Sequence, residues 1–494
     1  MAQSCGFDNS KYLQLQSSRI HERVEKFSKL YLEFGGKLFD DCHAARVLPG
    51  FDLNEKVKLL EELKDDAEII FCISANSIEK NKIRSDLGIT YDLEVLRLID
   101  NLRKRDLLIG AVVITMFSGQ AGALRFKQQL EARGIKVAIH YPIKGYPSDV
   151  EAIISEEGYG SNPFVETTRN LVVVTAPGPG CGKLATCLSQ LYHESKRGVK
   201  AGYSKFETFP VWNLPIDHPV NLAYEAATVD LKDKNLIDPF HLKKYGVETV
   251  NYNRDIEVFP VVDAILKKIL GYEVFASPTD MGVNMVGKCI VDPKVVEVAC
   301  KREIIRRYLD ERVKVVEGIS SEDNVKELEK LLERGGIQLK ERVCIEKACT
   351  TFKESDRMTM CLESPDGTCI TGKSSKLMVA CGSAILNAVK SLAGIPDKID
   401  IISPSVLEPL LRLKTDMLKM EYPQLHLEEV LHALAISAAT NPSAKAAVDC
   451  LPLIRGWDAH CSHIISRNDK ATLFKLGVTI TSEAVFSSKD LYSE

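Results

Sequence analysis

The sequence concentrates its most suggestive chemistry in the glycine-rich turn that follows the apolar run Leu171–Thr175. Gly178, Gly180 and Gly182 lie in this turn, and Lys183 stands where a helix is expected to begin. Such a turn directs backbone N–H groups, a helix N-terminus and one ammonium group toward a single point, which suits phosphate or another anion. The alternative is an ordinary strand-to-helix turn in which the glycines serve only tight packing.

The match to the P-loop pattern G-x-x-x-x-G-K-[ST] is partial. Pro177 stands where the first glycine belongs, and Leu184 stands where a hydroxyl would bind Mg²⁺. Thr175, Thr186 or a distant carboxylate would have to replace that hydroxyl, unless the anion binds without a metal. The candidates for such a metal-binding carboxylate are Glu207, Asp217 and Asp255. The turn therefore points to ATP and Mg²⁺ as cofactors.

Two other polar stretches are candidates for the same site. Gly35, Gly36 and Lys37 follow a predicted strand and precede Asp40–Arg46, which holds a paired acid, a histidine and an arginine. These residues could bind a polar ligand or simply form a surface turn with local ion pairs. Lys144 lies in a polar segment that follows another predicted strand.

The sequence does not predict a metal centre. It contains no His-Glu-x-x-His motif, and Cys461-Ser-His463 is too short a cluster to hold a tetrahedral ion alone. A metallopeptidase is therefore disfavoured. The 14 cysteines are scattered without a Cys-x-x-Cys pair, so we expect reduced thiols, no disulfide and no structural zinc.

Apolar runs alternate with helical patterns through the first half of the chain. Strands are predicted at 30–33, 68–73, 109–115, 136–140 and 171–175, which indicates β-α-β units and a parallel sheet. The strand ends then share one edge, so we expect Asn76, Gly119, Lys144 and Gly178 to surround one cleft. The irregular, aromatic region that begins at Gly202 is predicted to cover it, with a packed structural connection as the alternative.

The fold class predicted is α/β, in three parts. Residues 1–254 form a Rossmann-like domain that binds an anion or nucleotide, 255–336 a helical subdomain, and 337–494 a separate α/β domain. Charged amphipathic helices in the middle part suit packing against the sheet or another subunit, and we expect a homo-oligomer. In the last part, Pro365-Asp366-Gly367 between apolar runs predicts a hairpin turn.

Composition sets the remaining limits. A chain of 494 residues is too long for one core, and its net charge of −4 offers no electrostatic case for nucleic acid or a membrane surface. The first residues carry no basic segment followed by an apolar one, so we expect no signal peptide. We therefore expect a cytoplasmic protein whose partner is a small phosphorylated molecule.

Several longer motifs resemble those of a mostly bacterial, uncharacterised family called domain of unknown function 1846. They are Tyr31–Asp40, Ala45–Phe51, Lys80–Asp92, His140–Pro147, Thr175–Lys183, Lys205–Pro210, Asn221–Ala227 and Ser277–Asn284. The resemblance covers nearly the whole chain and implies a cytosolic α/β protein with a helical middle part and a distinct C-terminal α/β domain. It implies no established activity, although some members carry the label of ATP-dependent peptidases. Relatives usually have serine where this chain has Cys181.

The leading hypothesis from the sequence is an enzyme that performs phosphoryl transfer or ATP-dependent ligation. Gly178, Gly180 and Gly182 would cradle the phosphates, Lys183 would neutralise the charge that is transferred, and Glu207 and Asp255 are the further catalytic candidates. A non-catalytic, oligomeric metabolite-binding protein is one alternative. A hydrolase or lyase acting on a phosphorylated small molecule through Cys181 or His140 is another, although the sequence shows no base to activate either residue.

Overall fold

The computed structural model describes residues 5–84 and 87–488. The chain divides into two compact units, residues 2–300 and 301–494, and the boundary falls within helix α13 (Pro293–Val316). Each unit has its own sheet, which confirms the predicted α/β class with a separate α/β region toward the C-terminus. The predicted three-part boundaries stay a prediction.

The first unit is built on a seven-stranded sheet in the order β11-β8-β1-β7-β2-β5-β6, in which every pairing is parallel. Its strands are β1 (Lys29–Phe34), β2 (Ala67–Ser74), β5 (Leu108–Thr115), β6 (Val137–Ile139), β7 (Leu171–Thr175), β8 (Ala201–Phe206) and β11 (Gly282–Val283). Two small hairpins accompany it, β3 (Ile83–Arg84) with β4 (Ile89–Thr90) and β9 (Asn235–Ile237) with β10 (Val250–Tyr252).

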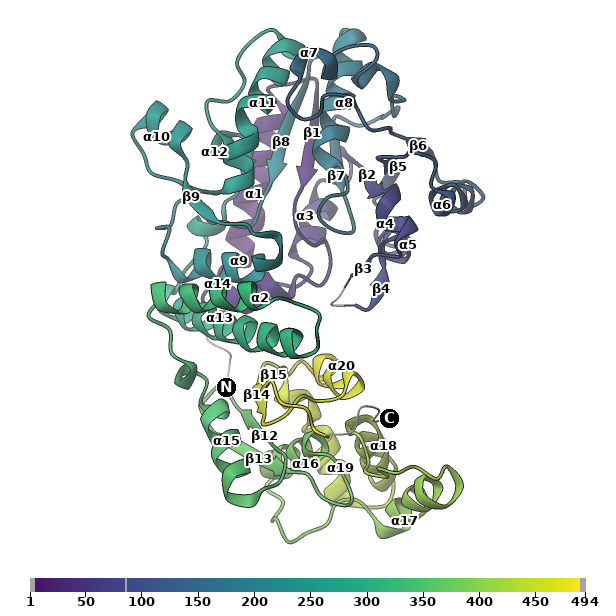
Figure 1. Cartoon of the computed structure of the whole chain (residues 1–494), viewed down its shortest axis with the longest axis vertical. Helices are drawn as coiled ribbons and strands as arrows, with labels where there is room; N and C mark the ends of the chain where they lie inside the picture. The colour runs from purple at the N-terminus through teal and green to yellow at the C-terminus, as the bar shows by residue number, and fades with distance from the viewer. Residues whose placement is uncertain (1–4, 85–86, 489–494) are drawn as a thin grey trace. The chain divides into compact units, whose positions relative to one another are not determined.

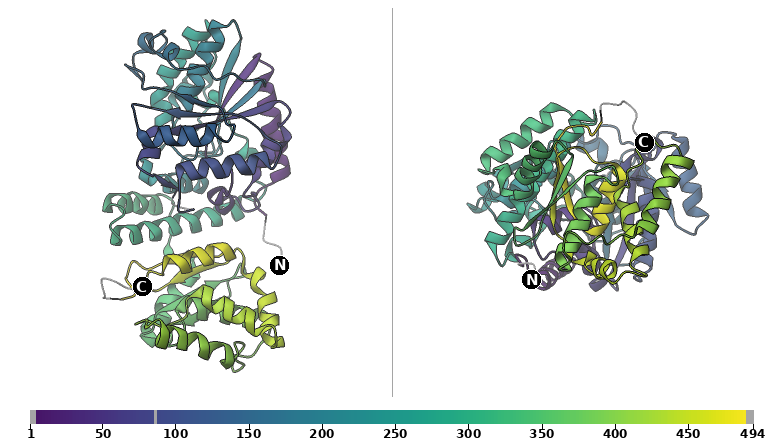
Figure 2. Two further views of the ribbon diagram at one scale, coloured as in Figure 1. Left: turned by 90° about the vertical axis from the view of Figure 1, so that its right-hand side faces the viewer. Right: turned by 90° about the horizontal axis from the view of Figure 1, so that it is seen from below.

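Helices cover both faces of this sheet (Figures 1 and 2). The helices of the first unit that precede α13 are α1 (Asn9–Val24), α2 (Cys42–Val47), α3 (Glu55–Glu62), α4 (Ala75–Glu79), α5 (Tyr91–Arg103), α6 (Ala121–Glu131), α7 (Val150–Ile153), α8 (Lys183–Lys196), α9 (Pro219–Ala227), α10 (Pro239–Tyr245), α11 (Asn253–Leu270) and α12 (Pro278–Met281). Strands covered on both faces explain the nearly unbroken apolar runs that made β2, β5 and β7 predictable.

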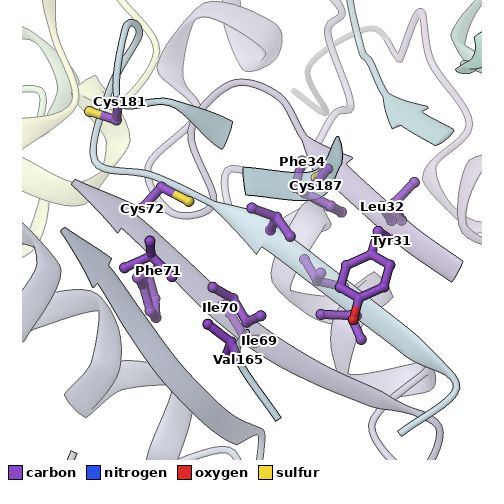
Figure 3. Close-up of a cluster of buried hydrophobic side chains, with 14 of the residues drawn as sticks. Tyr31, Leu32, Phe34, Ile69, Ile70, Phe71, Cys72, Val165, Cys181 and Cys187 are labelled. Carbon is purple, nitrogen blue, oxygen red and sulfur yellow. The ribbon is translucent and has the colours of Figure 1, made fainter. Parts of the chain in front are cut away.

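The core of the first unit lies between the sheet and these helices. Figure 3 shows side chains of β1 and β2 in it, among them Tyr31, Ile69 and Phe71, all of which are fully buried. Tyr31 donates a hydrogen bond of 2.9 Å to Glu194 Oε1, and this contact places α8 over the face of the sheet that carries Tyr31. Helix α11 packs beside α8, where Ser195 Oγ donates to Ile269 O at 3.0 Å.

Two predictions about the middle of the chain are wrong. Residues 202–206, predicted as part of an irregular covering loop, belong to β8, an internal strand between β1 and β11. The strand was missed because Ser204 and Lys205 are polar, yet both are largely buried in the fold, where Lys205 is paired with Asp255. The region predicted as a helical subdomain, residues 255–336, contains β11, whose two residues extend the sheet beyond β8.

The second unit has a four-stranded mixed sheet in the order β13-β12-β14-β15. Its strands are β12 (Thr359–Glu363), β13 (Cys369–Lys373), β14 (Asp458–Cys461) and β15 (Thr479–Ser482), and its helices are α14 (Glu322–Arg334), α15 (Val343–Ser355), α16 (Ala380–Leu392), α17 (Pro404–Arg412), α18 (Leu427–Ser437), α19 (Pro442–Asp449) and α20 (Arg467–Leu476). The predicted hairpin is confirmed, because β12 and β13 pair antiparallel around Pro365-Asp366-Gly367.

Among the described residues, no helix is both long and apolar enough to cross a membrane.

Candidate functional site

The ends of the central strands meet at one edge of the first sheet. Because all pairings are parallel, the turns after β1, β2, β5, β6, β7 and β8 leave the sheet on the same side, as predicted for β2, β5, β6 and β7. A small hydrogen-bond network joins two of these ends, in which Gln120 Nε2 donates to Asn76 Oδ1 at 2.8 Å and to Ser118 Oγ at 3.0 Å. This edge is where the glycine turn lies.

The glycine turn has the backbone that a close approach to a ligand requires. Gly180 and Gly182 have φ of 73° and 81°, in the left-handed region that favours glycine. A Cβ built on Gly180 meets no atom within 4 Å, so the turn is open there, whereas a Cβ on Gly178 would lie 2.2 Å from the hydroxyl of Tyr91. The tyrosine ring therefore covers one side of the turn and leaves the other side accessible.

Helix α8 begins directly after this turn. Gly182 is its N-cap residue, no side chain caps its first N–H groups, and its first turn holds no acidic residue. The partial positive charge of those N–H groups therefore has no anionic partner from the helix itself. Lys183, the first residue of α8, adds a full positive charge at the same place.

A carboxylate that the sequence did not single out lies beside this lysine. Glu33, on β1, places Oε1 3.9 Å from Lys183 Nζ, and the two side chains are 11% and 16% exposed. Tyr203 on β8 donates a hydrogen bond of 2.8 Å to the other oxygen of Glu33. Burial and the charge of Glu33 raise the pKa of Tyr203 well above its ordinary value, so the phenol stays protonated and remains a donor.

Two of the predicted catalytic residues form a second group one strand farther along. Lys205 on β8 is paired with Glu207 Oε1 at 2.9 Å and with Asp255 in the first turn of α11, and it also contacts the hydroxyl of Tyr252. Burial disfavours the ammonium of Lys205, but Asp255 and Glu207 outweigh burial and raise its pKa. Burial raises the pKa of Glu207 to about 7, with Asp255 adding to the rise and Lys205 opposing it.

The two groups belong to one polar cluster. Glu33 and Lys205 are register partners in neighbouring parallel strands, so their side chains leave the same face of the sheet. Lys183 and Asp255 approach this face from the N-terminal turns of α8 and α11, which pack together. We name Glu33, Lys183, Lys205, Glu207 and Asp255 the strand-end cluster. A small hollow opens beside Glu207, lined by Pro210, Trp212, Asn251 and Asn284 among others.

The remaining predicted site residues have different settings. Thr186 is buried beneath the turn, where its hydroxyl accepts from Cys72 Sγ at 3.4 Å. Lys144 is exposed in the segment after β6, and Asp217 is exposed before α9. The Gly35 N–H donates to Phe206 O at 3.1 Å, which ties the end of β1 to the end of β8.

Gly36 and Lys37 continue the chain after β1. A Cβ on Gly36 would lie 2.6 Å from Lys56 Nζ, which is itself paired with Asp41 Oδ2 at 2.8 Å. Lys37 is partly exposed. Asp41 is one of the two adjacent acids that the sequence suggested as a ligand-binding group, and in the structure it is paired with the buried Lys56.

Cys181 and His140 are poorly placed for nucleophilic or acid–base chemistry. Cys181 is 1% exposed, and burial raises the pKa of its thiol (Figure 3). His140 is 4% exposed, its Nε2 lies 3.1 Å from Pro163 O, and burial lowers its pKa to about 4. A thiol that resists ionisation and an imidazole that resists protonation favour structural roles for both.

The fold and the cluster define an α/β protein with a Rossmann-like parallel sheet and a P-loop-like glycine turn at its strand ends. Residues 5–336 match the family model described as Domain of unknown function DUF1846, N-terminal, and residues 340–492 match the model of the C-terminal domain of the same name. The chain belongs to this family.

Relatives resemble the chain over its full length. It is 54% identical over 496 residues to a UPF0371 protein of Clostridium botulinum (strain Alaska E43 / Type E3), with 99% of both chains covered. It is 52% identical to UPF0371 proteins of Clostridioides difficile (strain 630) and Fusobacterium nucleatum, again over 99% of both chains. The names of these relatives state no activity.

Proposed function

We propose that the chain binds a nucleotide or another phosphorylated metabolite at the glycine turn and performs phosphoryl transfer or ATP-dependent ligation there. The observation that carries the proposal is the start of α8. Its uncapped N–H groups, the left-handed turn that is open at Gly180, and the ammonium of Lys183 converge on one point at the edge of a parallel sheet. Phosphate oxygens satisfy the amides and the ammonium at once.

Glu33 is the residue best placed to replace the hydroxyl that is missing at Leu184. Mg²⁺ is commonly held by one or two carboxylates together with phosphate oxygens of the substrate. Glu33 lies 3.9 Å from Lys183 Nζ, so a phosphate bound by Lys183 would lie close to this carboxylate. The hydrogen bond from Tyr203 orients Glu33 toward the turn.

Glu207 supplies the acid–base group in this proposal. A pKa of about 7 lets its carboxyl take or give a proton near neutral pH, which general base catalysis of attack by a hydroxyl or amine requires. Lys205 and Asp255 position it, because Lys205 pairs with both carboxylates. Lys183 neutralises the charge that develops on the transferred group.

Titration calorimetry of the full chain with ATP and with inorganic tripolyphosphate, each with and without Mg²⁺, tests the proposal. Binding to both compounds is expected, because the turn recognises phosphate, and Glu33→Gln should remove the effect of Mg²⁺ while Mg²⁺-free binding persists. No binding of either compound would contradict the proposal. Binding without turnover in the presence of hydroxyl and amine acceptors would favour the non-catalytic metabolite-binding protein.

A further inference from the structure

A second group of chemically active side chains lies in the unit formed by residues 301–494. Cys349 from α15, His460 from β14 and Glu483, which directly follows β15, place one ligand atom each within 4.8 Å of one another. His460 is fully buried, and Cys349 and Glu483 are partly exposed. The three residues lie far apart in the sequence, which is why no spacing motif revealed them.

The contacts of His460 are compatible with a neutral ring that carries its proton on Nδ1. Thr481 Oγ1 lies 3.1 Å from Ala459 O and 2.9 Å from His460 Nδ1, so a hydroxyl that donates to this carbonyl accepts from Nδ1. Full burial disfavours a doubly protonated ring. A neutral imidazole with its proton on Nδ1 presents the lone pair of Nε2 to Cys349 and Glu483.

This arrangement leaves two acceptors facing each other. His460 Nε2 lies 3.4 Å from Glu483 Oε1, and it is a buried nitrogen without a hydrogen-bond partner. Buried polar atoms are nearly always satisfied, and a lone pair opposite a carboxylate oxygen is repulsive unless a proton or a metal cation lies between them. The unsatisfied Nε2 is thus a second observation, independent of the clustering, that points to a bound cation.

The spacing fits a zinc ion. Zn–N and Zn–O bonds of about 2.1 Å at a tetrahedral angle separate the nitrogen and the oxygen by about 3.4 Å, and a Zn–S bond of about 2.3 Å separates sulfur and oxygen by about 3.6 Å. The observed separations are 3.4 Å from Nε2 to Oε1 and 3.9 Å from Cys349 Sγ to Oε1. Thiolate, imidazole and carboxylate together select Zn²⁺ over Mg²⁺, which prefers oxygen ligands alone.

The neighbouring charges are compatible with a dication. A thiolate and a carboxylate bring two negative charges to the cluster, which balance Zn²⁺. Arg312 lies 3.9 Å from Glu483 Oε2, the oxygen that points away from His460, and so leaves Oε1 for the metal. Arg342 is engaged by Asp458 Oδ1 at 3.1 Å and by Thr479 O at 3.0 Å. The hydrogen bond from Nδ1 to Thr481 is the outer contact that ligating histidines characteristically make.

We propose that Cys349, His460 and Glu483 bind one Zn²⁺, which ties α15 to the end of the second sheet. On binding, the thiol of Cys349 loses its proton to solvent as the S–Zn bond forms, and a water molecule or a small ligand completes the tetrahedron on the partly exposed side. This inference departs from the expectation of a zinc-free chain. It is independent of the phosphate site, because the three ligands belong to a different unit of the chain.

The test uses the full-length, untagged protein, stripped with a chelator and then titrated with Zn²⁺ or Mg²⁺. We expect one Zn²⁺ per chain, no Mg²⁺, and a thiolate-to-cobalt charge-transfer band when Co²⁺ replaces Zn²⁺. Cys349→Ser should remove the band and weaken Zn²⁺ binding about tenfold or more. Cys450→Ser is the matched control, because Cys450 is a partly exposed thiol in the same unit, and this variant should keep both properties.

Glu483→Gln provides a second variant, since a partly exposed side chain of nearly the same shape is exchanged without opening the core. It should retain the circular dichroism of the wild type and bind Zn²⁺ more weakly. Substoichiometric Zn²⁺ in the wild type would overturn the proposal. So would wild-type affinity in either Cys349→Ser or Glu483→Gln.

Discussion

Tyr203→Phe removes one hydroxyl and tests whether Glu33 depends on it. The bond from the Tyr203 hydroxyl to Glu33 Oε2 is 2.8 Å long, and both residues are largely buried, at 2% and 9% exposure. Hydrogen bonds to charged groups contribute about 1.5–3 kcal/mol, and a buried carboxylate left without its donor incurs a comparable penalty. We therefore expect the first unit to lose about 2 kcal/mol of its free energy of unfolding.

The assay follows one unit at a time. Each unit holds one of the two tryptophans, Trp212 or Trp457, so urea unfolding in a Trp457→Phe background reports the first unit through Trp212 fluorescence. With an m-value of about 2–3 kcal/mol/M, a loss of about 2 kcal/mol lowers the midpoint by about 0.7–1 M. Tyr272→Phe is the control, because this ring is 45% exposed and should change stability by less than about 0.5 kcal/mol. An equally small effect of Tyr203→Phe would refute the reasoning about Glu33.

Three further predictions concern the glycine turn and its neighbours. Gly178→Ala should destabilise the first unit more than Gly180→Ala, because a Cβ at 178 overlaps the ring of Tyr91. A Cβ at 180 meets open space and costs only about 1–2 kcal/mol of backbone strain. Equal decreases in the melting temperature of the two variants would contradict this. In native protein, iodoacetamide should label the exposed Cys5 and spare Cys181, whose buried thiol has a raised pKa. Peptide mass mapping checks this, and label found at Cys181 would contradict the prediction. The pKa of Glu207 is raised from 4.5 to about 7, so its contribution to folding stability is complete below about pH 4.5 and is lost as pH rises through 7. Between pH 5 and 8 the melting temperature of the wild type should therefore fall more than that of Glu207→Gln. Melting temperatures that change with pH in the same way in both proteins would count against the raised pKa.

The sequence predicted the elements whose signals are local. The valines of β7 and the apolar run of β2 predict strands that are covered on both faces, and the alternation of strands with helices predicts a parallel sheet. The glycine turn was found for the same reason, since glycines next to a lysine at a helix start are adjacent in the chain. Convergence of the strand ends followed from the parallel direction alone.

What the sequence did not reveal depends on contacts between distant residues. In the sequence, Glu33 is a charged residue within an apolar strand and has no nearby partner. In the structure, Tyr203 and Lys183, which lie 170 and 150 residues farther along the chain, contact it. β8 was not predicted because Lys205 places a charge in the strand. That charge can be buried only because Glu207 and Asp255 pair with it. A polar residue inside an otherwise apolar strand was the available signal, since such a group must find a partner.

The most direct test of the central claim compares the affinity of ATP for the wild type, Lys183→Ala and Lys196→Ala by titration calorimetry at fixed ionic strength. Both lysines belong to α8, but Lys183 begins the helix at the glycine turn and Lys196 ends it, 61% exposed and paired with Glu156. Loss of a charge-assisted hydrogen bond at the turn should weaken binding by about 1–3 kcal/mol, or about 5- to 150-fold, in Lys183→Ala and leave Lys196→Ala unchanged. Equal affinity of Lys183→Ala and the wild type would contradict the account that phosphate binds at the start of α8.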